Sequence, residues 1–130
     1  MSINTNTSVP IYQQIADHVR GRVAAGIHRP GEMLPSIRAL AIELVVNPNT
    51  VQRAYDELDW EGLVELRRGV GFVVTEQGVR VARNQLEQAA RGSFSQGIVL
   101  ARSANISEES IRGIFDRAMS DSGVREGGGT

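Results

Sequence analysis

The sequence predicts a mainly α-helical chain with one small β-hairpin, ordered as a winged helix-turn-helix followed by a short two-helix region. Three observations lead to this fold class. The first 60 residues contain three helical stripes of apolar side chains. Two β-rich runs around a glycine-containing turn come next. From Glu76 the pattern changes to long helical segments, and 130 residues with 41% hydrophobic content suit one domain with an appendage.

The first helix is expected from Pro10 to about Ala25. Proline suits the first turn of a helix, where its missing N–H is not needed. The apolar positions recur every four residues and are Ile11, Ile15, Val19 and Val23. Residues 1–8 are polar, so we expect them to be disordered.

The second and third helices follow each other closely, with only Val45 and Val46 between them. Ser36 is a favourable N-cap for the second helix, Asn47 for the third, and Pro48 suits the first helical position. The buried side of the second helix is predicted to be Ile37, Leu40, Ala41 and Leu44. The buried side of the third is predicted to be Val51, Ala54, Tyr55 and Leu58.

The next segment, "LVELRRGVGFVVT", has the pattern of a β-hairpin. Leu63–Leu66 and Phe72–Thr75 are β-rich and flank a turn with two glycines. Three helices and a hairpin in this order predict a winged helix-turn-helix domain over residues 9–75.

Residues 76–121 are predicted to form two helices that pair with those of a second copy. The first is long and weakened by Gly92 and Gly97. The second is capped by Ser107 and has one apolar side, which is too small to form a core alone. We therefore expect a homodimer, in which the dimerisation residues are Ile111, Ile114 and Phe115. The glycine-rich residues 122–130 are expected to be a disordered tail.

Composition argues against several classes of enzyme. Cysteine is absent and all 14 basic residues are arginine, which excludes thiol nucleophiles, Fe–S clusters and Schiff-base lysines. His18 and His28 lie on different predicted elements, so a metal site is not expected. We predict no enzyme activity, no cofactor and no metal. No apolar run approaches the ~20 residues that cross a bilayer, and the N-terminus does not resemble a secretory signal, so a cytoplasmic protein is expected.

The third helix, "NPNTVQRAYDEL", has chemically different ends. In a helix-turn-helix the second helix of the pair enters the major groove by its N-terminal end. The residues left for the groove are Asn49, Thr50, Gln52 and Arg53. Asn and Gln pair with adenine, Arg with guanine, and Thr with a thymine methyl group or a phosphate. The acids Asp56, Glu57, Asp59 and Glu61 begin about one turn later, where the helix should leave the groove.

Two other features support a DNA-binding surface. Ser36 and Arg38 begin the second helix, which crosses the DNA backbone in this geometry. At the tip of the hairpin, glycines allow a sharp turn beside two arginines; these residues are Arg67, Arg68, Gly69 and Gly71. The net charge of −1 and pI of about 6.1 predict weak binding to DNA of unrelated sequence.

The spaced motifs "PIYQQI", "GIHRPGEMLPSIR", "NPNTVQRAY" and "EGLVELRRGVGF" resemble the DNA-binding domain of GntR-family bacterial transcription regulators. The form "NPNTVQRAY" with a short helical C-terminal part resembles the YtrA subfamily. The resemblance implies a dimeric repressor on a pseudo-palindromic operator. It carries over onto Ser36, Arg38, Asn47, Asn49, Thr50, Gln52, Arg53, Arg68, Gly69 and Gly71.

The chain departs from the GntR pattern at three positions. Many members have arginines at the positions of Pro48 and Gln52, so fewer charged base contacts are available here. A glycine is usual at the position of Val45, which would be strained if φ is positive there.

The sequence thus predicts a sequence-specific regulator that binds double-stranded DNA. The alternative is a winged-helix module that binds another protein through the acidic end of its third helix. A small-molecule effector, if one exists, is expected between the winged helix and the C-terminal helices.

Overall fold

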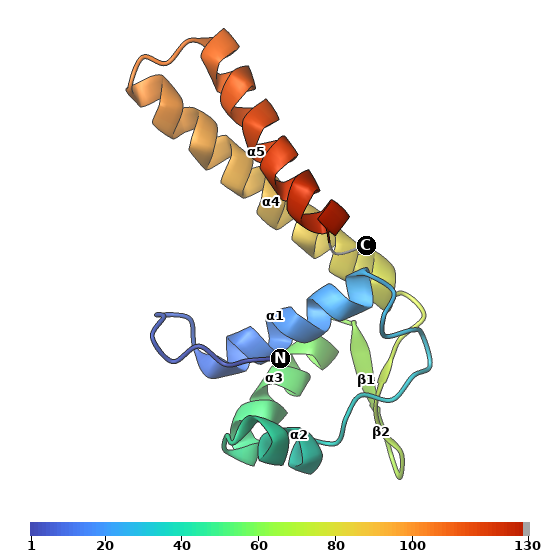
Figure 1. Cartoon of the computed structure of the whole chain (residues 1–130). Coiled ribbons are helices and arrows are strands. Elements are labelled where there is room, and N and C mark those ends of the chain that lie inside the picture. Colours follow the sequence, from blue (N-terminus) through green and yellow to red (C-terminus); the bar gives the residue numbers. More distant parts are fainter. Residues whose placement is uncertain (129–130) are drawn as a thin grey trace. The chain divides into compact units, whose positions relative to one another are not determined.

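The computed structural model describes residues 1–128, and their side chains as far as residue 122. It comprises two compact units, Met1–Glu87 and Gln88–Thr130. The elements, in chain order, are α1 (Ile11–Ala24), α2 (Ile37–Leu44), α3 (Pro48–Trp60), β1 (Val64–Arg67), β2 (Gly71–Val74), α4 (Gly78–Ser103) and α5 (Glu108–Gly128) (Figure 1). A mainly helical chain with one antiparallel hairpin confirms the predicted fold class.

The beginnings of α2 and α3 form as the sequence predicts. The Ser36 hydroxyl accepts a hydrogen bond from the Ala39 N–H at 3.0 Å, and the Asn47 side chain accepts one from the Asn49 N–H at 2.8 Å. Pro48 is the first residue of α3. Each cap satisfies one of the N–H groups that the first turn of a helix leaves without a partner.

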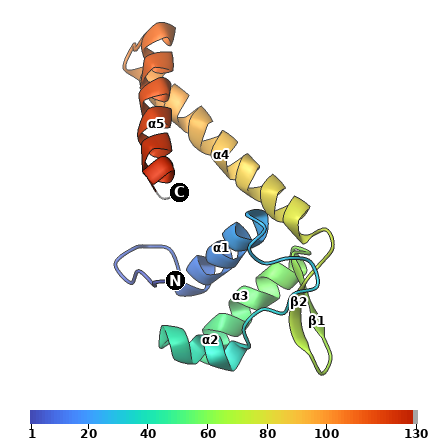
Figure 2. The same ribbon diagram turned by 45° about the vertical axis from the view of Figure 1, so that its right-hand side comes forward.

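The core of the first unit forms around α3, which lies alongside α1 (Figure 2). The predicted stripe of α3 is completely buried and packs with apolar side chains of α1 and α2; the α3 residues are Val51, Ala54, Tyr55 and Leu58. Ala82 of α4 joins the same cluster with no exposed surface. The first turns of α4 therefore belong to the winged-helix unit, which continues to Glu87.

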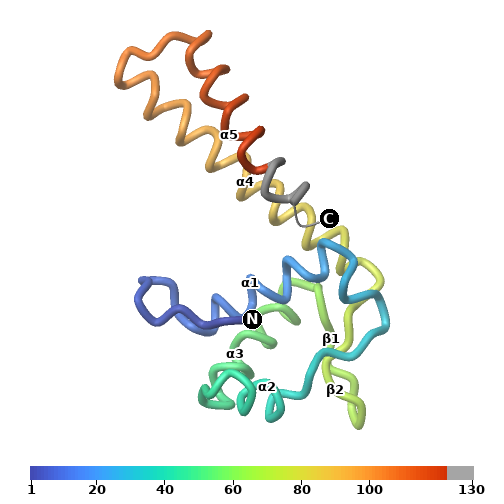
Figure 3. The backbone as a smooth tube through the Cα atoms, viewed as in Figure 1, coloured from blue at the N-terminus to red at the C-terminus, as the bar shows by residue number. Residues whose placement is uncertain are grey.

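The connector between α1 and α2 is more ordered than its turn-rich sequence suggests. It runs along β2 (Figure 3), where Gly31 N–H donates to the Val74 carbonyl at 2.8 Å and Leu34 N–H donates to the Phe72 carbonyl at 2.8 Å. Met33 forms an antiparallel bridge with Val73. The connector thus supplies a third line of backbone pairing beside the hairpin, because β2 has a free edge.

Tyr55 ties three parts of the first unit together. Its hydroxyl donates to the Pro35 carbonyl at 2.8 Å, and its ring meets Phe72 edge-to-face with centroids 5.2 Å apart. Burial raises the pKa of Tyr55 to about 12. The side chain links α3, the residue before the α2 N-cap, and the hairpin.

Tyr55→Phe is expected to lower the free energy of unfolding by about 1–2 kcal/mol, because the Pro35 carbonyl loses its donor. The difference in the free energy of unfolding between wild type and Tyr55→Phe should also depend on pH. The unfolded tyrosine loses its proton near pH 10, whereas the folded one keeps it until about pH 12. The stabilisation is therefore complete below pH 10 and is lost as pH rises from 10 to 12. Urea unfolding of both proteins between pH 8 and 11 tests this; a constant difference across that range would contradict it.

Both ends of the chain were predicted from composition to be disordered. Near the N-terminus, the Gln14 amide accepts from Asn4 N–H at 2.9 Å and donates to the carbonyls of Asn4 and Val9 at 2.7 and 3.1 Å. A side chain in the first helix thus holds the segment, which local composition cannot reveal. The tail predicted to be disordered begins at residue 122, within the bounds of α5, and its disorder stays a prediction. Residues 129–130 lie outside the described residues.

Candidate nucleic-acid interface

The residues predicted to contact DNA come from three elements of the first unit. The start of α2, the start of α3 and the hairpin tip lie on the same side of the unit, which is the lower side in Figures 1 and 2. Eight of these residues are exposed: Ser36, Arg38, Asn47, Asn49, Arg53, Arg67, Arg68 and Gly69. Thr50, Gln52 and Gly71 are half-buried. The fold therefore gathers on one side residues that are up to 35 positions apart in the chain, from Ser36 to Gly71.

Two of the predicted α3 residues already have partners in the free protein. The Gln52 amide donates to the Asp56 carboxylate at 2.8 Å along the exposed side of the helix. The Arg53 guanidinium carbon lies 3.8 Å from the centre of the Tyr12 ring on α1, within cation–π distance. Tyr12 was not among the residues predicted for this surface, although it lies in the motif "PIYQQI". Its ring and Arg53 are 41 positions apart.

The two hairpin arginines differ in their surroundings. Arg67 is the last residue of β1, paired with Gly71, and its side chain bonds Glu65 on the same strand at 3.0 Å. Arg68 lies in the turn itself and forms no ion pair or hydrogen bond with the other described residues. Gly69 has φ +79° and Gly71 φ +126°, a backbone region that strongly favours glycine. Of the two hairpin arginines, Arg68 is therefore the one whose guanidinium is available to a ligand.

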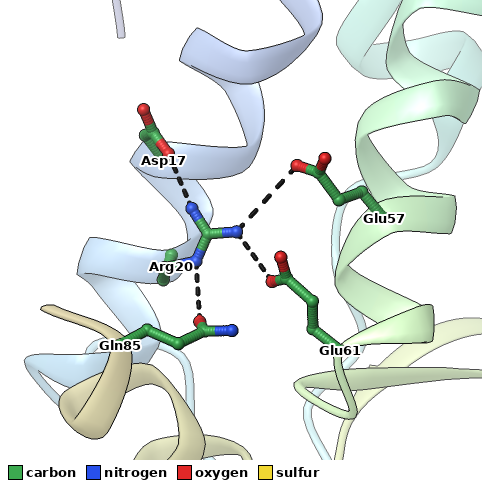
Figure 4. Close-up of polar contacts among 5 residues, drawn as sticks. All are labelled: Asp17, Arg20, Glu57, Glu61 and Gln85. Carbon is green, nitrogen blue, oxygen red and sulfur yellow. Dashed lines mark hydrogen bonds and ion pairs between the residues drawn. The ribbon is translucent and has the colours of Figure 1, made fainter. Parts of the chain in front are cut away.

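The acidic end of α3 is partly neutralised from within the unit by Arg20 of α1 (Figure 4). The Arg20 guanidinium bonds Glu61 at 2.7 Å, Asp17 at 2.6 Å and the Gln85 amide at 2.8 Å, with Glu57 at 4.0 Å. Arg20 is only 9% exposed. Glu57 and Glu61 therefore turn toward α1, which reduces the acidic surface available to a partner protein.

Val45, in the turn between α2 and α3, adopts φ 55° and ψ 52°. This is the left-handed region, which a β-branched residue rarely occupies. The side chain is 89% exposed, so packing does not compensate the strain.

Val45→Gly is expected to raise the free energy of unfolding by about 1 kcal/mol, since relief of the left-handed strain exceeds the entropy that glycine adds to the unfolded chain. Thermal unfolding measures the change. Asn105→Gly is the matched control: Asn105 has φ 58°, but asparagine tolerates this region, so the shift there should be small. Equal shifts at both positions would contradict the assignment of strain to the valine.

The second unit exposes apolar side chains that its two helices do not cover. Ile111 is half-buried, while Ile114 and Phe115 are 46% and 48% exposed. Phe115 meets Phe94 of α4 edge-to-face at 6.1 Å. Between α4 and α5 lies an apolar groove of about 850 Å³, lined by these two rings and by Ile98, Ile111 and Ile114. The helical hairpin thus leaves room for another apolar group.

No group of three or more His, Asp or Glu side chains among the described residues is placed to bind a metal ion. None of their helices is long and apolar enough to cross a membrane.

Comparisons with known proteins agree with this architecture. Residues 11–74 match the family described as bacterial regulatory proteins, gntR family. The HTH-type transcriptional repressor YtrA of Bacillus subtilis is 34% identical over 110 residues, covering 78% of this chain and 85% of that protein. A solved GntR family transcriptional regulator from Listeria monocytogenes is 31% identical, with a TM-score of 0.74 over 86% of this chain and 97% of that one. YtrA from Sulfolobus acidocaldarius, a GntR-family transcription factor, is 34% identical, with a TM-score of 0.56 over 93% and 97% of the two chains.

The similarity is therefore not confined to the winged helix, and it confirms the resemblance that the spaced motifs indicated. The chain belongs to the GntR family of bacterial regulatory proteins and is similar to its YtrA-type members.

Proposed function

We propose that this protein is a sequence-specific DNA-binding regulator of transcription that acts in the cytoplasm as a dimeric repressor on a pseudo-palindromic operator. One observation carries the proposal. The starts of α2 and α3 and the hairpin tip share one side of the winged-helix unit, while Glu57 and Glu61 turn away toward Arg20. DNA-binding winged helices place these same three elements on the major groove and the adjoining backbone.

The proposed contacts divide by element. The beginning of α2 contacts the backbone through Ser36 and Arg38, and the hairpin contacts it through Arg67, Arg68, Gly69 and Gly71. The start of α3 enters the major groove with Asn47, Asn49, Thr50, Gln52 and Arg53. Asn47 and Ser36 also serve as N-caps, so their side chains are held in place before DNA arrives.

The dimer is proposed to form through the second unit. This unit has exposed apolar side chains and an open apolar groove. Large exposed apolar patches usually mark an interaction site. We propose that α4 and α5 of a second copy cover Ile111, Ile114 and Phe115. Two-fold symmetry of the protein then matches the symmetry of the operator. The repressor role rests on similarity to the protein named as the YtrA repressor.

Selection of bound duplexes from a random pool tests the function as a whole. We expect a palindromic consensus with two half-sites, bound by a species of twice the chain mass in sedimentation. Loss of binding as salt rises would report the phosphate contacts. Failure to enrich any sequence at low salt would instead favour the alternative, a winged-helix module that binds another protein.

A further inference from the structure

The edge of α3 that faces α1 carries two polar contacts, one in its second turn and one at its C-cap. Tyr12 meets Arg53 at 3.8 Å, and Arg20 meets Glu61 at 2.7 Å. Tyr12 and Arg20 are eight residues apart on α1. Arg53 of α3 and its C-cap residue Glu61 are also eight residues apart, which is about 12 Å along a helix. The two helices therefore run in the same direction (Figure 2) and are joined at two places.

The contact with Tyr12 decides where the Arg53 guanidinium lies. A planar guanidinium that stacks on a ring uses its face, and its five N–H groups point outward in the plane. None of them forms a hydrogen bond within the described part of the chain. Arg53 thus keeps its donors available, but at the α1 edge of α3 and not over the middle of the exposed side.

That edge is the wrong place for reading a base and the right place for a phosphate. A helix is about 10–12 Å wide and the major groove about 12 Å, so an inserted helix has a phosphate strand along each side. Base edges at the floor of the groove are reached from the N-terminal turn, where Asn49 and Thr50 lie. Arg53 follows in the second turn and is drawn sideways onto α1.

We propose that Tyr12 holds Arg53 against a DNA phosphate, so that Arg53 fixes the position of α3 in the groove and does not read guanine. Tyr12 is then a positioning residue, which acts through Arg53. Base recognition by α3 is left to Asn49, Thr50 and Gln52, and the amides among them are chemically matched to adenine. The inference rests on the proposed DNA-binding function.

The test compares wild type, Arg53→Ala, Tyr12→Phe, Tyr12→Leu and the double variant Tyr12→Leu/Arg53→Ala. Anisotropy titrations on the selected operator and on a scrambled duplex are run at several salt concentrations. Arg53→Ala should weaken binding to both duplexes by the same factor and make the salt slope shallower by about 0.9 for each Arg53, which is about 1.8 for the proposed dimer. Selection with Arg53→Ala should return the wild-type consensus.

The Tyr12 variants separate positioning from folding. Tyr12→Phe keeps the ring and should match wild type, whereas Tyr12→Leu should lose part of the affinity that Arg53 supplies. In the Arg53→Ala background, Tyr12→Leu should change binding no further. Thermal unfolding of each variant shows whether a loss reflects unfolding.

Three results have different consequences. A larger loss on the operator than on the scrambled duplex, or a changed consensus, would show that Arg53 reads a base and overturn the inference. An equal effect of Tyr12→Leu with and without Arg53 would overturn the role of Tyr12. No operator preference in the wild type would overturn the proposed function itself, and this assignment with it.

Discussion

Replacing Arg20 with alanine is expected to lower the free energy of unfolding by about 2–3 kcal/mol. The substitution leaves Asp17 of α1, Glu61 at the C-cap of α3 and the Gln85 amide of α4 without their shared cation. Removing one partner of a buried ion pair costs about 3–5 kcal/mol. We expect a smaller loss for Arg20→Ala because the Asp17 and Glu61 side chains are 53% and 25% exposed. Water can therefore partly replace the lost guanidinium.

Urea unfolding followed by circular dichroism measures this change. Trp60 is 90% exposed and would be a poor fluorescent reporter of the core. Arg112→Ala is the matched control, since its ion pair with Glu108 at 2.8 Å is as short as those of Arg20, but its two side chains are 76% and 73% exposed. We expect no measurable change there. A comparable loss in both variants would show that ion-pair geometry, and not burial, determines the contribution of Arg20.

The parts of this fold that the sequence predicted depend on near neighbours in the chain. Ser36 and Asn47 mark helix starts through hydrogen bonds within three residues, and Pro48 occupies the first position of α3. Helical spacing alone identified the stripe of α3 that is buried. Once the buried stripe of α3 was identified, the opposite side of the helix was predicted to be exposed. Local patterning thus determined the elements of the candidate surface and most of its residues.

The parts that were missed depend on residues far apart in the chain. Arg20 finds its partners 41 and 65 positions away, and Arg53 finds Tyr12 across the gap between two helices. The connector between α1 and α2 pairs with β2 about 40 residues later. None of these contacts leaves a periodic signal, because each requires the complete fold to bring its partners together.

The glycines of α4 also show that the role of a residue in packing cannot be predicted from its spacing in the sequence. The sequence suggested that Gly92 and Gly97 would weaken the long helix, yet α4 is continuous from Gly78 to Ser103. A glycine in a helix interior costs only about 1 kcal/mol relative to alanine. That penalty is spread over 26 residues in α4. Spacing cannot distinguish a glycine that merely weakens a helix from one that the packing requires, and Gly78 is of the second kind.

Gly78→Ala is expected to lower the free energy of unfolding by about 1–3 kcal/mol, the usual cost of adding atoms to a packed site. A Cβ at this position would lie 2.7 Å from the Leu63 carbonyl oxygen and 3.1 Å from a methyl group of Val74. The carbonyl cannot move freely, because it accepts hydrogen bonds from the Thr75 N–H and hydroxyl at 3.0 and 3.2 Å. Relief of the contact must therefore displace either the end of the hairpin or the first turn of α4.

Gly92→Ala makes the same change in the same helix, where an added Cβ would meet nothing within 4 Å. It is expected to raise the free energy of unfolding by up to about 1 kcal/mol, through the better helix propensity of alanine. Thermal unfolding of the two variants should thus shift the midpoint in opposite directions. A drop in both would mean that Gly92 is also required, as it would be if another helix packed closely against α4 in the proposed dimer. Sedimentation of Gly92→Ala would then distinguish a lost dimer contact from a weakened helix, since only the former changes the mass of the complex.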